Sequence, residues 1–96
     1  MPTDKIKPLA RFPAIYSLPL QVGLGEYLIN HRETMEDCKR LARHYRCFLN
    51  SIRNLPLHPF NKVLEKYSVR TAIRQDFPKG FSLIVRVNRK VEIPDY

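Results

Sequence analysis

The stretch Glu33–Ile52, which reads ETMEDCKRLARHYRCFLNSI, has the hydrophobic spacing of an amphipathic α-helix. Its apolar residues recur at steps of three and four and would form one buried stripe: Met35, Cys38, Leu41, Ala42, Tyr45, Phe48, Leu49 and Ile52. Thr34 can cap the first turn, and Asp37 follows it by three residues, as in a capping box. We therefore predict a long helix here, whose apolar side is the main packing face of the fold.

Basic residues of this predicted helix lie away from the apolar stripe, and they are Lys39, Arg40, Arg43 and Arg46. The helix dipole favours anions at the start of a helix and cations at its end, but it does not require four cations. We predict that these side chains contact the backbone of a nucleic acid; a solvated helix face is the alternative. Tyr45 could stack on a base or bind a phosphate, although its place on the stripe also fits core packing.

The charge balance of the whole chain also indicates a polyanionic partner. Seventeen Lys and Arg oppose nine Asp and Glu, which gives a net charge of +8 in 96 residues. A compact domain with this excess attracts polyanions over a Debye length of about 10 Å. Nucleic acid is the partner that we expect, with an anionic membrane surface as the competing one.

Length and composition predict a single domain over residues 1–96, with residues 1–11 as a flexible basic arm. No apolar run approaches the roughly 18 residues of a membrane span, and the first residues do not resemble a secretory signal. We therefore expect a soluble, cytoplasmic protein. Its oligomeric state is left open.

The remaining segments predict further helices and a hairpin. Val22–Ile29 has the apolar content of a short helix, although Gly23 and Gly25 weaken it. Another helix is expected to begin at Pro59, since proline is favoured in the first turn. Residues 81–87 and 90–93 are expected to form two strands around a turn at Asn88 and Arg89. The predicted fold class is α+β: a small, mostly helical domain of about three helices with a C-terminal β-hairpin.

A second group of cations depends on how far the helix after Pro59 extends. Lys62, Lys66, Arg70 and Arg74 are spaced at four, so a continuous helix would align them in a row that contacts nucleic acid. β-Branched residues disfavour a helix near Val69, and residues 68–76 are equally compatible with helix, loop or strand. Basic residues at the predicted hairpin tip, residues 86–90, are a third candidate.

The chain offers little for catalysis or for a metal. Its three histidines and two cysteines lack the spacing of a zinc site, and no glycine-rich phosphate loop is present. The serines lack the context of a nucleophile, and the few acids mostly lie at the helix start. We expect no metal, no cofactor and no enzymatic activity.

The segment Phe12–Leu28, FPAIYSLPLQVGLGEYL, resembles the entry segment of the ProQ/FinO family of bacterial RNA-binding proteins. The matching residues are Phe12, Pro19, Leu20, Val22, Gly23, Leu24 and Leu28. A weaker similarity reaches Ile52, and the Arg-x-Asp-Leu-x-Gly stretch of the family is missing. The resemblance implies binding of an RNA hairpin with a single-stranded 3′ end. Backbone N–H groups near Gly23, at the start of the first predicted helix, could then bind a phosphate.

Together these observations predict a protein that recognises structured RNA through a basic helical face, as an RNA chaperone or post-transcriptional regulator. Two alternatives stay open. One is a winged-helix DNA-binding regulator, with the helix near Asn61–Arg74 in the major groove. The other is a protein of a mobile element whose basic face binds an acidic host partner.

Overall fold

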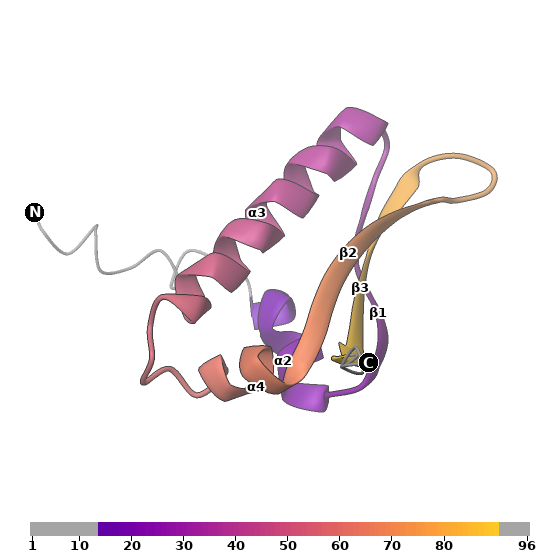
Figure 1. Cartoon of the computed structure of the whole chain (residues 1–96). Helices are drawn as coiled ribbons and strands as arrows, with labels where there is room; N and C mark the ends of the chain where they lie inside the picture. The colour runs from indigo at the N-terminus through magenta and orange to yellow at the C-terminus, as the bar shows by residue number, and fades with distance from the viewer. Residues whose placement is uncertain (1–13, 91–96) are drawn as a thin grey trace, which may run out of the picture.

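The computed structural model describes residues 14–90, which form an α+β domain with three α-helices and a three-stranded antiparallel sheet, as expected (Figure 1). The elements follow one another as η2 (Ala14–Ser17), α2 (Leu18–Val22), β1 (Gly25–Arg32), α3 (Met35–Arg53), α4 (Asn61–Lys66), β2 (Tyr67–Gln75) and β3 (Phe81–Arg89). The predicted arm over residues 1–11 and the predicted strand over residues 90–93 lie outside the described residues, apart from Lys90.

Helix α3 confirms the prediction for Glu33–Ile52. The Thr34 hydroxyl accepts a hydrogen bond from the Asp37 backbone N–H at 3.1 Å, so the expected cap begins the helix. The predicted stripe is buried from Cys38 to Ile52, whereas Met35 is 39% exposed because it lies in the first turn, at the end of the helix.

The sheet has the strand order β1-β3-β2, so β3 is central and β1 and β2 are its edges. In β3, Leu83, Val85 and Val87 are fully buried and belong to the same hydrophobic core as the stripe of α3, which lies along one face of the sheet (Figure 1). The rings of Tyr16 and Tyr45 lie 5.4 Å apart in that core. Burial of this apolar surface holds α3 against the sheet.

The helix predicted over Val22–Ile29 is wrong, because α2 ends at Val22 and the chain enters β1 at Gly25. Gly23 has a φ of 102°, which only glycine adopts readily, and its N–H donates to the Pro19 carbonyl at 3.0 Å. Two of the apolar residues that suggested a helix instead pair with β3: Tyr27 with Val85 and Leu28 with Ile84.

The second helix prediction fails beyond Lys66, where α4 ends and β2 begins. The alternating residues Val69, Thr71 and Ile73 pair with β3 in a regular antiparallel register. β-Branched residues favour a strand when a partner strand is available. The supposed row of cations is therefore split, with Lys62 and Lys66 on α4 and with Arg70 and Arg74 on β2.

The predicted turn at Asn88 and Arg89 is also wrong, because both residues continue β3 and pair with the start of β2. The C-terminal hairpin consists of β2 and β3, and its loop covers residues 76–80. The Asp76 N–H donates to the Gly80 carbonyl at 3.0 Å, and Gly80 has a φ of 105°. Gly80, which adopts this φ, closes the hairpin eight residues before Asn88, the position that the sequence suggested.

Candidate nucleic-acid interface

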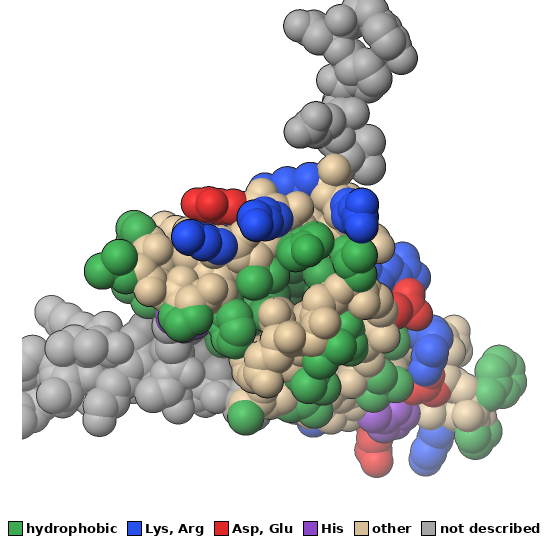
Figure 2. Space-filling view, turned by 90° about the horizontal axis from the view of Figure 1, so that it is seen from below, with side chains coloured by type: hydrophobic (Ala, Val, Ile, Leu, Met, Phe, Trp, Pro, Cys, Tyr) green, Lys and Arg blue, Asp and Glu red, His purple; other side chains and the backbone are tan. Residues whose placement is uncertain are grey.

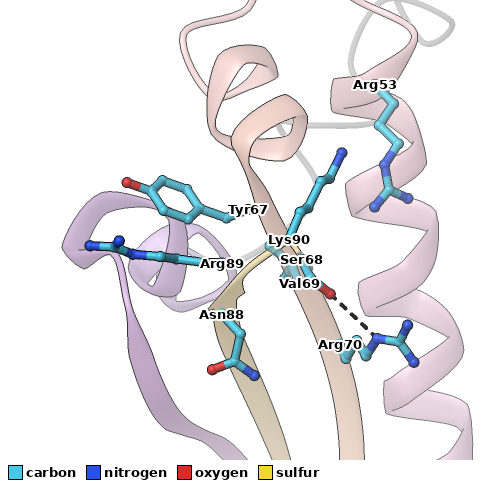
Figure 3. A pocket seen from close by; sticks show the side chains of 8 residues that line it. All are labelled: Arg53, Tyr67, Ser68, Val69, Arg70, Asn88, Arg89 and Lys90. Atoms are coloured by element: carbon cyan, nitrogen blue, oxygen red, sulfur yellow. Dashed lines mark hydrogen bonds between the residues drawn. The ribbon is translucent and has the colours of Figure 1, made fainter. Parts of the chain in front are cut away.

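A groove runs between α3 and the edge strand β2, and three adjoining hollows form it. The first, of about 620 Å³, is shown in Figure 3 and is lined by Arg53, Tyr67, Ser68, Val69, Arg70, Asn88, Arg89 and Lys90. The second shares Arg53, Val69 and Arg70 with it and adds Arg46, Leu49, Asn50 and Thr71. The third shares Arg46 and Thr71 and adds Lys39, Ala42, Arg43, Ala72 and Ile73. We call this continuous surface the α3–β2 groove.

The lining of the α3–β2 groove is strongly basic. The residues that line it include no Asp or Glu. They include seven cations, namely Lys39, Arg43, Arg46, Arg53, Arg70, Arg89 and Lys90. All seven residues are exposed. A concave surface that carries charge of one sign concentrates counterions of the opposite sign.

The ion pairs between described residues leave these seven cations unneutralised. Arg40 contacts Asp37 at 3.1 Å, Arg74 contacts Asp76 at 3.2 Å and Arg86 contacts Glu26 at 2.7 Å. All three of these arginines lie outside the groove lining. Within the groove, Arg70 donates from Nε to the Ser68 hydroxyl at 3.3 Å (Figure 3), a bond that leaves its charge intact.

Helix geometry aligns four of the groove cations. These four cations follow one another at steps of four, three and seven residues, which places them on one side of α3. They are Lys39, Arg43, Arg46 and Arg53. Their backbones span about 21 Å at 1.5 Å per residue. Since the opposite side of α3 is buried in the core, this row is held on a rigid element.

Basic side chains are unevenly distributed on the face of the molecule that Figure 2 shows. Seen from the end where α2 and α4 lie, the centre of the surface is largely apolar, and Lys and Arg side chains lie along its edges (Figure 2). Exposed apolar residues come from η2, α2, β1 and the link between α2 and β1, and they include Ile15, Leu18, Val22, Leu24 and Leu28.

Four of the eight cations predicted from the sequence line the groove, and they come from two elements: Lys39, Arg43, Arg46 and Arg70. The other four predicted cations do not line the groove. Arg40 and Arg74 are paired with acids, and Lys62 and Lys66 are exposed on α4. Three of the four cations predicted for the helical face therefore line the groove, and their contact with nucleic acid stays a prediction.

The other three groove cations are Arg53, Arg89 and Lys90. Arg89 and Lys90 belong to the third candidate group, the basic residues at positions 86–90, whereas Arg53 was not predicted. Arg53 lies one residue beyond the predicted helix end and seven after Arg46, a helical spacing that could have identified it. Arg89 and Lys90 reach the groove because β3 continues beside the start of β2.

Two other predicted contacts are corrected by the structure. Tyr45 is fully buried, so its ring cannot stack on a base, and its hydroxyl has no hydrogen-bond partner among the described residues. Burial raises the pKa of this hydroxyl, and Tyr16 raises it further. Gly23 ends α2 and does not begin a helix. Its N–H donates to the Pro19 carbonyl and is therefore not available to a phosphate, and its carbonyl accepts from the Tyr27 hydroxyl at 2.6 Å.

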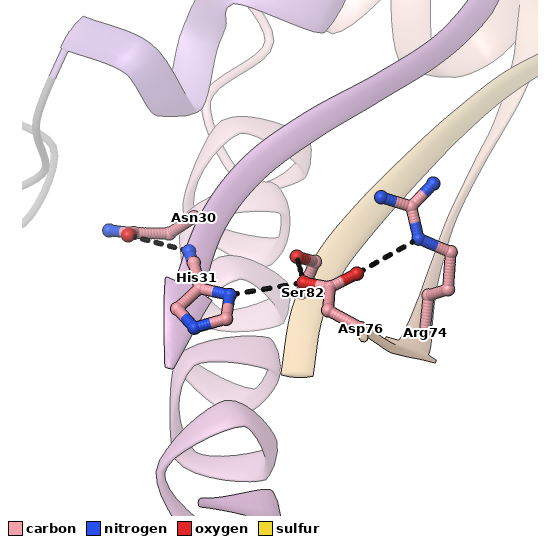
Figure 4. Close-up of polar contacts among 5 residues, drawn as sticks. All are labelled: Asn30, His31, Arg74, Asp76 and Ser82. Carbon is pink, nitrogen blue, oxygen red and sulfur yellow. Dashed lines mark hydrogen bonds and ion pairs between the residues drawn. The ribbon is translucent and has the colours of Figure 1, made fainter. Parts of the chain in front are cut away.

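A polar network at the base of the β2–β3 loop was not predicted (Figure 4). The Asp76 carboxylate accepts a hydrogen bond from the Ser82 hydroxyl, lies 3.0 Å from Nδ1 of His31 on β1, and accepts from Nε of Arg74 at 3.2 Å. Hydrogen bonds from Ser82, then from His31 and Arg74, lower the pKa of the Asp76 carboxyl. An aspartate followed by Pro78 and Gly80 is a turn signal that could have located this loop.

This network does not have the order of a catalytic triad. In a triad the imidazole lies between the carboxylate and the hydroxyl, so that it can take the hydroxyl proton. Here Asp76 lies between His31 and Ser82, and the Ser82 hydroxyl donates directly to the carboxylate. Ser82 is also only 1% exposed. The arrangement therefore ties three strands together without activating the serine.

Within residues 14–90, no group of three or more His, Cys, Asp or Glu side chains is placed to hold a metal ion. The two cysteines are free thiols, with Cys38 buried and Cys47 exposed. In the same part of the chain, no helix combines the length and the apolar character needed to cross a membrane.

No protein-family model matches this chain, and neither a curated protein nor a solved structure does. The resemblance of Phe12–Leu28 to the ProQ/FinO family accordingly stays a prediction.

Proposed function

We propose that this chain binds structured RNA, with the phosphate backbone of the RNA in the α3–β2 groove. The observation that carries the proposal is the set of seven exposed cations, unpaired with acids among the described residues, along one concave surface. Such a surface is the electrostatic footprint of a nucleic-acid-binding protein.

The chemistry of the lining suits phosphate. Five of the seven groove cations are arginines, whose planar guanidinium can donate two hydrogen bonds to one phosphate. Structured RNA is recognised largely through its shape and its backbone, which requires cations on a rigid scaffold more than side chains that read base edges. The resemblance of Phe12–Leu28 to an RNA-binding family supports RNA over DNA. A role as an RNA chaperone or post-transcriptional regulator is part of the same proposal.

A gel-shift comparison tests this function. We expect an RNA hairpin with a single-stranded 3′ tail to bind more tightly than duplex DNA of equal length, with an affinity that falls steeply between 50 and 200 mM salt, roughly the range over which phosphate contacts weaken. Equal affinity for both would favour a DNA-binding or non-specific protein. Absence of binding to either at low salt would favour an acidic protein partner.

Two arginines of α3 form a matched pair for the same assay. We expect Arg43→Ala to weaken RNA binding by about 1 kcal/mol or more, roughly fivefold in Kd, because it removes a charge-assisted hydrogen bond. Arg40→Ala removes the same charge from the same helix, but Arg40 contacts Asp37 and lies outside the groove. Equal effects of the two substitutions would show that net charge, and not the groove, governs binding.

A further inference from the structure

The tip of the β2–β3 hairpin presents an aromatic side chain to solvent. Phe77 is 96% exposed, and only Leu57, at 98% in the loop between α3 and α4, is more exposed among the large hydrophobic residues described. Phe77 therefore contributes almost nothing to the core, although phenylalanine is among the residues most often buried.

Hydrogen bonds fix the loop that carries this ring. The Asp76 N–H donates to the Gly80 carbonyl, and the Asp76 carboxylate connects the loop to Ser82 of β3 and His31 of β1 (Figure 4). The His31 ring lies so close to Gly80 that a Cβ there would meet it at 2.2 Å. Because its two flanks are held, the loop presents Phe77 from a defined position.

The hairpin tip continues one wall of the α3–β2 groove. Strand β2 lines the groove as far as Ile73, and Phe77 follows four residues later, about 13 Å further along an extended chain. In Figure 1 the hairpin curves away from α3 towards its tip. Lys79, two residues after Phe77, adds an exposed cation to the same loop.

We propose that Phe77 stacks on an unpaired base of the RNA whose backbone occupies the groove. This inference rests on the proposed function and adds to it the class of RNA: one with a base outside a duplex, in a loop, a bulge or a tail. Every base offers a face to an aromatic ring, so stacking needs no particular sequence. A base inside a continuous duplex is already stacked on both sides and is not accessible to Phe77.

A fluorescence experiment tests the contact directly. The chain has no tryptophan, so Phe77→Trp introduces the only one. We expect its emission to be quenched when a hairpin RNA with a loop and a 3′ tail is added, and to stay unchanged with a blunt RNA duplex. Leu57→Trp is the control, because that position is equally exposed but lies outside the hairpin, and its emission should not respond to either RNA.

Affinity supplies the second readout. Phe77→Ala should weaken binding of the tailed hairpin at least about fivefold, the lower end of the range for one stacked base, while binding of the blunt duplex is unchanged. Leu57→Ala should leave both affinities unchanged. Since both side chains are exposed, neither substitution removes a core contact, and thermal unfolding checks that the variants are folded.

Each other outcome overturns the inference in a recognisable way. If Phe77→Ala binds both RNAs as the original chain does, and Phe77→Trp emission does not respond, Phe77 does not stack, although an effect of Arg43→Ala would still support the groove. If the original chain binds no RNA at low salt, both proposals fail. If Phe77→Ala reduces binding to vesicles of anionic lipid and not to RNA, the ring inserts into membranes instead.

Discussion

Arg40 and Arg43 lie three residues apart on α3 and yet have different surroundings. Arg40 contacts Asp37 at 3.1 Å, whereas Arg43 lines the groove beside β2. Exposed ion pairs contribute little to stability, about 0–1 kcal/mol, but they do neutralise the charge that a ligand would otherwise meet. At the scale of single residues, the presence of an acid nearby therefore separates arginines available to a phosphate from those that are not.

The Asp76 carboxyl leads to a prediction about how the stability of the protein depends on pH. Because the pKa of this carboxyl is lowered in the folded protein, the folded state binds the proton less tightly than the unfolded chain. The stabilisation of the folded state by ionised Asp76 is complete above the ordinary pKa of aspartate. It is lost as the pH falls through the lowered pKa of Asp76 in the folded protein. We expect Asp76→Asn to lower the Tm at pH 7 and to have a smaller effect near pH 3.

Thermal unfolding of both proteins at the two pH values measures this difference. The matched control is Asp37→Asn, in which the carboxylate also contacts an arginine but no serine or histidine. An Asp76→Asn effect of the same size at pH 7 and pH 3 would contradict the role given to the carboxylate.

At the scale of elements, two glycines terminate segments for different reasons. Gly23 ends α2 with a φ of 102° and has no atom within 4 Å of the position of a Cβ. Gly80 closes the β2–β3 hairpin with a φ of 105°, and a Cβ there would meet the His31 ring. Gly23 is therefore required only for its backbone conformation. Gly80 is required for its backbone conformation and also for the space that the His31 side chain of β1 occupies.

We therefore expect Gly80→Ala to destabilise the protein more than Gly23→Ala. Both substitutions strain the backbone, at about 1–3 kcal/mol each. Gly80→Ala must in addition displace His31, which disrupts its contact with Asp76. Urea unfolding gives both free energies of unfolding, and equal losses would show that the His31 ring moves aside without cost.

At the scale of the whole molecule, the position of the charges matters more than their sum. The chain has a net charge of +8, and its unpaired groove cations share one surface while Arg40, Arg74 and Arg86 are neutralised locally. An even distribution would attract any polyanion weakly from all sides. A groove directs the attraction to one place.

Two triple variants with the same net charge test this point. Arg43→Ala with Arg46→Ala and Arg53→Ala should reduce the slope of log K against log salt by about 2–3, since each phosphate contact contributes about 0.7–0.9. Removing the three paired arginines, Arg40, Arg74 and Arg86, should leave the slope nearly unchanged. Salt titrations of RNA binding supply both slopes, and similar losses in the two variants would contradict a localised interface.

Short-range patterns determined α3 almost to its last residue. The Thr34 cap, the three- and four-residue spacing of its apolar side and the basic row Lys39, Arg43 and Arg46 all follow from helix geometry, which depends on near neighbours along the chain. The α+β class, the presence of a C-terminal hairpin and its strand over residues 81–87 were also predictable, because alternating β-branched residues indicate strands, but the position of the turn and the partner strand were not.

Only the tertiary structure decided the second wall of the groove. Residues 68–76 are compatible with helix or strand when taken alone, and they become β2 because Val69, Thr71 and Ile73 find partners in β3. That pairing brings Arg70 opposite Arg46 and Arg53, which are more than fifteen residues earlier in the chain. Strand pairing joins residues that are distant in sequence, so no local sequence pattern predicts which strands will pair. A helix forms its backbone hydrogen bonds within one segment, and its pattern can therefore be recognised from the sequence alone.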